Sequence, residues 1–231
     1  MHPIQFFYNS LSNNMATSNK INTVFFGLDG VIVDTEKYYD NFWNSVAEKH
    51  GLKIDNFAAI VKGMTMNAII ELYFTLETSE AKQAIRESCS DMEQSINYKD
   101  IVIPGVIEFI KYLKEQDYRI GLVTSSPTSK VGAVLNQLSI SRKFDTIITS
   151  DSIKKGKPDP MGYVLAKTNL GVDSSQCAVF EDAFSGIKAA TYAFMRVIGV
   201  TTTLSGDYLK DYTYGVTPDF SDIDKLKSLL S

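Results

Sequence analysis

Short apolar runs rich in β-branched and aromatic residues alternate along this chain with longer segments whose apolar residues recur at helical spacing. The first run, 24–26, ends at Gly27 and is followed by Asp29, which predicts a buried strand that leads into an acidic loop. Similar runs predict strands at 101–103, 118–123, 146–149, 177–180 and 197–200. Strands separated by helices indicate an α/β fold with a doubly wound, Rossmann-like parallel sheet.

Helical periodicity fills the segment between the first two predicted strands. Apolar residues recur at helical spacing within 34–51, where Gly51 is well placed to end the helix: Tyr38, Phe42, Trp43 and Val46. A second helical pattern follows Thr65 and a third covers 79–96. The sequence therefore predicts an α-helical insertion directly after the first strand.

Start signals place the remaining helices. Pro104 suits the first turn of a helix over 106–115, and Pro127 suits that of another helix capped by Ser126. The same cap-then-proline pattern recurs at 159–160, and further helices are predicted from about residue 184 and over 221–230.

Composition narrows the class of protein. At 231 residues with 44% hydrophobic and 22% charged residues, the chain is expected to be an ordinary soluble protein of one domain, or one domain plus an insert. A net charge of −4 gives no reason to expect nucleic acid or an anionic membrane as partner. No apolar run approaches the length of a membrane span. We expect a cytoplasmic monomer or weak dimer in which the residues before Lys20 form a loose leader.

Cysteine and histidine usage excludes several chemistries. Cys89 and Cys177 show no metal-binding or redox spacing, so free reduced thiols are expected. His2 and His50 are the only histidines, which argues against a histidine-based triad or metal site.

Polar side chains follow four of the predicted strands: Asp29, Thr124, Lys157 and the pair Glu181-Asp182. The carboxyl ends of parallel strands meet at one edge of a sheet, where ligands bind. An acid, a hydroxyl, an ammonium and a carboxylate pair at that edge would suit a phosphate held with a divalent cation.

The sequence around these positions resembles the haloacid dehalogenase (HAD) superfamily, whose first motif is Asp-x-Asp-Gly-Val-x-x-Asp-Thr. The stretch from Asp29 to Thr35 matches that motif from its second Asp onward. The resemblance covers nearly everything from Ile21. It implies a leader over 1–20, a HAD core over 21–35 and 104–231, and a helical cap domain over 36–103.

The resemblance implies catalytic roles. Asp29 would protonate the leaving oxygen and later take a proton from water, and its backbone carbonyl would ligate Mg²⁺. Thr124 would hydrogen-bond the transferring phosphoryl group, and Lys157 would neutralise its charge. Asp34 and Thr35 are expected to cap the first cap helix.

It also implies the binding groups. Glu181 and Asp182 would hold Mg²⁺, which prefers carboxylate oxygens. Ser125 and Ser126 lie at a helix start, where free N–H groups favour an anion.

One position departs from the family. Its nucleophilic Asp falls on Gly27, so no aspartyl-phosphate can form there and Mg²⁺ loses one ligand. Two explanations stay open: a natural degenerate member kept as a phospho-ligand binder or sensor, or an altered residue in an otherwise working enzyme. We expect little or no turnover from the Gly27 form.

The insertion bears on the substrate. Lys62 and the three residues after it resemble the cap recognition loop of the β-phosphoglucomutase and small-sugar-phosphatase branch. The mutase histidine aligns with Tyr39, which could face the substrate, and the loop arginine aligns with Met66. These losses favour a phosphatase of a small phosphorylated metabolite, with a mutase-like phosphotransferase and a non-catalytic binder as alternatives.

Overall fold

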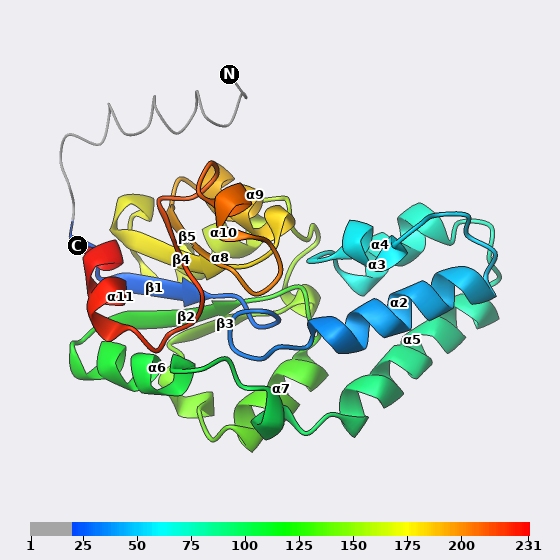
Figure 1. The fold of residues 1–231 in the computed structure, drawn as a ribbon, viewed down its shortest axis with the longest axis horizontal. Coiled ribbons are helices and arrows are strands. Elements are labelled where there is room, and N and C mark those ends of the chain that lie inside the picture. Colours follow the sequence, from blue (N-terminus) through cyan, green and yellow to red (C-terminus); the bar gives the residue numbers. More distant parts are fainter. Residues whose placement is uncertain (1–19) are drawn as a thin grey trace.

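The computed structural model describes residues 20–231, so the predicted leader lies outside the described residues except for Lys20. Over this range, six parallel strands form one sheet in the order β3-β2-β1-β4-β5-β6 (Figure 1). The strands are β1 (Thr23–Phe26), β2 (Arg119–Val123), β3 (Thr146–Ile148), β4 (Cys177–Glu181), β5 (Arg196–Val200) and β6 (Gly215–Thr217). Because the chain winds outward from β1 in both directions, the predicted doubly wound sheet is confirmed.

Helices cover both faces of this sheet (Figure 1). They are α6 (Val106–Glu115), α7 (Thr128–Gln137), α8 (Met161–Leu170), α9 (Phe184–Tyr192), α10 (Gly206–Leu209) and α11 (Ile223–Leu230). Short 3₁₀ helices span Tyr98–Ile101, Ser141–Lys143, Ser150–Ser152 and Ser174–Gln176. Among the described residues, no helix is both long and apolar enough to cross a bilayer.

The side chains of β1 alternate between two hydrophobic cores. Val24 and Phe26 belong to the core shared with α6, α7 and α11, and Phe25 belongs to the core shared with α8 and α9. All three side chains are fully buried. Burying each of them contributes about 1.5–3 kcal/mol, so β1 is anchored from both faces. A strand held in this way fixes the loop that follows it.

Four helices form a unit of their own beside the sheet (Figure 1). This helical unit consists of α2 (Glu36–Lys49), α3 (Phe57–Val61), α4 (Met66–Tyr73) and α5 (Ser79–Ser95). A separate hydrophobic core holds it together, in which Trp43 and Phe74 both pack edge-on against Phe57. The predicted helical insertion is present; α3 was not predicted.

The predicted strand at 101–103 is wrong. Residues Tyr98–Ile101 form a 3₁₀ helix, and Val102 makes only an isolated bridge to Val33. Both edges of β1 are already hydrogen-bonded, one to β2 and the other to β4. The segment therefore has no strand edge beside β1 on which to pair.

The predicted helix over 106–115 is confirmed, but the prolines at three helix starts do not occupy the first helical position as predicted. The residue before α6 is Gly105, in the left-handed conformation, so Pro104 lies outside the helix. Helices α7 and α8 begin one residue after Pro127 and Pro160. Two short elements, β6 and α10, were not predicted because each offers too few apolar positions to show a period.

Glycine at 105 is required by its surroundings. Its φ is +76°, and an added Cβ would lie 2.3 Å from the carbonyl oxygen of Phe220. We expect Gly105→Ala to destabilise the fold by more than about 1 kcal/mol. Gly132→Ala, inside α7 where an added Cβ meets nothing within 4 Å, should stabilise it by up to about 1 kcal/mol. Urea unfolding midpoints that move in the same direction for both variants would contradict this.

Candidate active site

The polar strand ends lie together because three strands are neighbours. Phe26 at the end of β1 pairs with Leu122 in β2 and with Phe180 in β4, all in parallel register. The loops that follow these strands therefore leave the sheet at the same edge. Asp29, Thr124 and Asp182 are carried by these loops.

Asp29 is held by three donors. The Thr35 hydroxyl and the Lys130 ammonium donate to Oδ1, and Ser126 Oγ donates to Oδ2 at 2.7 Å. Burial acts to raise the pKa of Asp29, but the charge of Lys130 and these hydrogen bonds bring it below its usual value. Thr35 lies at the N-cap position of α2 as predicted, but its side chain makes no cap hydrogen bond and donates to Asp29 instead. Ser126 also donates to Asp29, and the N-cap of α7 is Pro127 instead of Ser126.

Lys130 was missed by sequence reasoning. Its side chain is completely buried on α7, and Nζ also donates to the Tyr39 hydroxyl at 2.6 Å and lies 4.4 Å from the centre of that ring. Lys130 precedes Val134 by one helical turn, and Val134 faces the core. That spacing was the available sign that this lysine points inward.

The network continues into the helical unit. The Tyr39 hydroxyl donates to Glu93, which also accepts from Cys89 Sγ at 3.8 Å. Burial raises the pKa of Glu93 above its usual value, although Lys130 opposes the shift. Burial also raises the pKa of the Cys89 thiol to about 12. A buried chain of polar contacts therefore joins the sheet edge to α2 and α5.

The two acids at the end of β4 have different surroundings. Glu181 accepts from Lys157 and from the Tyr163 hydroxyl, and Lys157 also donates to the Val123 carbonyl at 3.1 Å. Asp182 accepts from the Thr203 hydroxyl. Burial, followed by the charge of Glu181, raises the pKa of Asp182 well above its usual value.

Gly27 lies beside this acid pair. Its N–H donates to the Phe180 carbonyl at 3.0 Å. An added Cβ would lie 3.0 Å from Val31 Cγ2 and 3.4 Å from Glu181 Oε2. A side chain at 27 would therefore fit after a small shift of Val31.

The donor set for Mg²⁺ is incomplete. Among the described residues, no group of three or more His, Cys, Asp or Glu side chains is arranged to hold a metal ion. Glu181 is already ion-paired with Lys157, and the Asp29 carboxylate is directed to Lys130. Within residues 20–231 Asp182 forms no ion pair, although the charge of Lys157 acts on it, so the site fits a cation only in part.

The predicted phosphate-binding residues lie where the helical unit meets the sheet edge. Thr124 Oγ1 accepts from the Ser126 N–H at 3.0 Å. Ser125 Oγ donates to the Gly63 carbonyl at 2.7 Å, in the loop between α3 and α4. Lys62 in that loop forms ion pairs with Glu36 and with Asp40.

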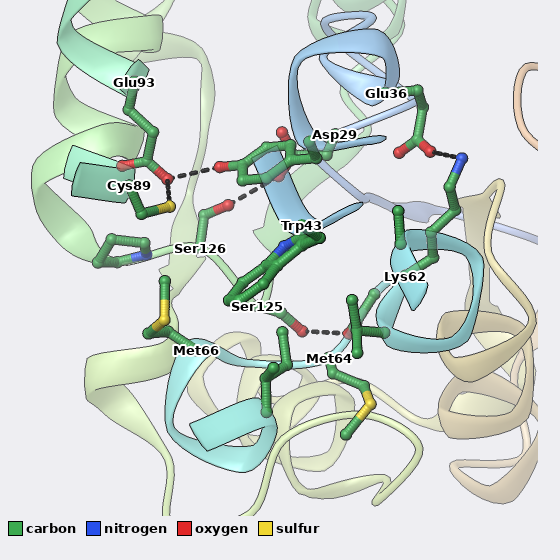
Figure 2. Close-up of a pocket in the computed structure, with 16 residues that line it drawn as sticks. Asp29, Glu36, Trp43, Lys62, Met64, Met66, Cys89, Glu93, Ser125 and Ser126 are labelled. Atoms are coloured by element: carbon green, nitrogen blue, oxygen red, sulfur yellow. Dashed lines mark hydrogen bonds and ion pairs between the residues drawn. The ribbon is translucent and has the colours of Figure 1, made fainter. Parts of the chain in front are cut away.

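A pocket of about 100 Å³ lies between the helical unit and the carboxyl edge of the sheet. Figure 2 shows the Trp43 ring among its lining residues. Predicted site residues that line it are Asp29, Tyr39, Lys62, Ser125 and Ser126. The others (Gly27, Thr124, Lys157, Glu181 and Asp182) do not line it but lie at or beyond the ends of the strands.

The fold and the strand-end residues together define a doubly wound α/β protein with a polar site at the carboxyl edge of its sheet and a helical unit over that site. The chain belongs to the haloacid dehalogenase-like hydrolase family, whose model matches residues 24–200.

Named relatives lie in one part of this family. Validoxylamine A 7'-phosphate phosphatase of Streptomyces hygroscopicus subsp. limoneus is 30% identical over 190 residues, covering 80% of this chain and 88% of the relative. Beta-phosphoglucomutase of Bacillus subtilis is 30% identical over 187 residues, covering 77% and 82%. The crystal structure of beta-phosphoglucomutase from Clostridium difficile aligns with a TM-score of 0.76 at 28% identity, covering 91% and 97%. These relatives place the chain near the β-phosphoglucomutase and sugar-phosphatase branch.

Removing the buried ammonium group of Lys130 should lower the free energy of unfolding. We expect Lys130→Met to destabilise the fold by about 3–5 kcal/mol, because it leaves the Asp29 carboxylate without its cation. Lys227→Met, which removes an exposed pair with Asp224, should change the free energy of unfolding far less than Lys130→Met does. Equal losses for the two variants in chemical denaturation would contradict the role assigned to Lys130.

Asp182 should destabilise the fold at neutral pH. Its pKa is raised in the folded state, so its stabilising contribution belongs to low pH and is lost as the pH rises through the folded-state value. We expect Asp182→Asn to raise the melting temperature at pH 7 and to raise it less at pH 4. A gain that is the same at both pH values would show that burial of the charge is not the cause.

Proposed function

We propose that this chain has the scaffold of a Mg²⁺-dependent phosphohydrolase for a small phosphorylated metabolite, with very low turnover in its Gly27 form. Residues 36–103 act as the cap and 21–35 with 104–231 as the core. The observation that carries the proposal is the position of Gly27 at the polar strand ends, where the other family motif residues are retained. A Cβ atom added to Gly27 would lie 3.4 Å from Glu181 Oε2.

Each retained residue has a place in that chemistry. In that chemistry Asp29 would protonate the leaving oxygen and accept a proton from water. Because the Lys130 ammonium and the hydrogen bonds hold the pKa of Asp29 below its usual value despite burial, the carboxyl is ionised at neutral pH, which disfavours the acid step and adds to the low turnover. Thr124 and the N–H groups near Ser126 hold the phosphoryl oxygens, and Lys157 balances their charge. The step that is missing is attack on phosphorus by a carboxylate, because Gly27 has no side chain.

Other groups in the pocket do not replace that nucleophile. The Ser125 hydroxyl donates to the Gly63 carbonyl, which cannot act as a base. The Ser126 hydroxyl donates to Asp29, but the lowered pKa of Asp29 makes that carboxylate a weak base. Cys89 lines the pocket, but its pKa of about 12 keeps the thiol protonated at neutral pH.

Mg²⁺ remains part of the proposal as the family's cofactor. When bound, it would supply positive charge against the phosphoryl oxygens. Because the carboxylate set is incomplete in this chain, the Gly27 form should bind Mg²⁺ weakly.

Two observations weigh against a mutase. Tyr39 is bonded to both Lys130 and Glu93, and Met66 brings no charge to the pocket. A mutase must hold and reorient a bisphosphorylated intermediate, which requires more polar contacts. A non-catalytic phospho-ligand binder is the second candidate, and Gly27 is the observation that favours it.

Restoring the carboxylate tests the proposal. We expect Gly27→Asp to raise Mg²⁺-dependent phosphatase activity at least about 100-fold over the Gly27 form. Gly27→Ala is the matched control, since its Cβ makes the same contact with Val31 but adds no carboxylate. Strong activity of the Gly27 form would refute low turnover. A folded but inactive Gly27→Asp variant that still binds phosphate would favour the binder.

A further inference from the structure

The polar side chains that line the pocket are already bonded to each other or to the backbone. The three hydroxyl groups donate their protons within the protein, from Tyr39 to Glu93, from Ser125 to the Gly63 carbonyl and from Ser126 to Asp29. The charged pair Glu36–Lys62 closes another side. A ligand would have to displace these contacts in order to use them.

The rest of the lining is apolar. Apart from Pro127 at the start of α7, its side chains come from the helical unit and from the loop between α3 and α4 (Figure 2): Trp43, Ala58, Val61, Met64, Met66 and Ile69. Trp43, Val61 and Ile69 are buried in the core of the helical unit, so this wall is held in place by packing. Met64 and Met66 are only partly buried and pack against that core. Their flexible side chains suit an apolar group of variable shape.

The space available is small. The pocket volume of about 100 Å³ lies below the roughly 300–1,000 Å³ typical of sites for drug-sized ligands, so a small organic group suits it better than a large one. A polyhydroxylated ring entering it would lose its water shell and find hydroxyl donors that are already engaged, which is unfavourable. A short hydrocarbon group would exchange water for carbon and sulfur contacts.

We propose that the ligand of this pocket is a phosphate monoester whose organic part is small and apolar instead of polyhydroxylated. The phosphate would lie at Thr124 and the N–H groups near Ser126, as in the proposed function, and the organic part would enter the pocket against Trp43 and Met66. This inference rests on the proposed function, because it assumes that the site binds phosphate. It names the ligand class that the lining of this chain selects.

Calorimetric titration of the full Gly27 chain, with Mg²⁺ present, tests the inference. The probes are inorganic phosphate and a matched pair with the same three-carbon skeleton, n-propyl phosphate and glycerol 3-phosphate. We expect n-propyl phosphate to bind at least about tenfold more tightly than glycerol 3-phosphate. Equal or tighter binding of glycerol 3-phosphate would overturn the inference and leave phosphate binding intact. No binding of any probe would overturn the proposed function as well.

A substitution in the wall links the preference to this pocket. Met66→Gln should reduce the preference for n-propyl phosphate at least about threefold, because it places a polar group on the apolar wall. Leu72→Gln is the matched control on the same helix, since Leu72 is exposed and does not line the pocket. If the two variants keep the same preference as the unaltered chain, the organic group binds elsewhere and the inference is wrong.

Discussion

The buried contact between the Lys130 ammonium and the Asp29 carboxylate is the interaction on which the arrangement of the site depends. It holds the acidic loop after β1 against α7, and through Tyr39 and Glu93 it connects both to the helical unit. A charge pair of this kind is tolerated in a protein interior only when further hydrogen bonds satisfy both partners. Thr35, Ser126 and Tyr39 provide those bonds, so their positions follow from the pair.

The sequence predicted the fold class well because the sheet strands are strongly apolar. Phe25 and Phe26 alternate between two cores, and that demand for burial on both faces is visible in the chain itself. The segment at 101–103 was misassigned because its composition suits a strand. Whether it pairs depends on free edges in the sheet, which local composition does not reveal. The short strand β6 was missed because its three residues show no strand pattern of their own. Its hydrogen bonding to β5 makes it a strand.

The site was predicted where motifs carry it and missed where tertiary contacts do. The position of Asp29, Lys157 and Asp182 near the strand ends followed from their order after successive strands, while their roles stay predictions. Lys130 carries no motif, and its burial depends on partners far away along the chain, Asp29 and Tyr39. Ser126 was assigned to a helix cap because local rules favour capping, but a distant carboxylate competes for its hydroxyl.

The loop between α3 and α4 is bound to the rest of the protein through hydrogen bonds to its backbone. Ser125 donates to the Gly63 carbonyl, and Ser185 donates to the Lys62 carbonyl at 3.3 Å. Because main-chain oxygens are present whatever the residue, these contacts do not depend on the side chains of Met64 in the loop or of Met66 at the start of α4. The ligand selectivity of such a scaffold can therefore diverge during evolution, one side chain at a time, without weakening the contact between the helical unit and the sheet domain.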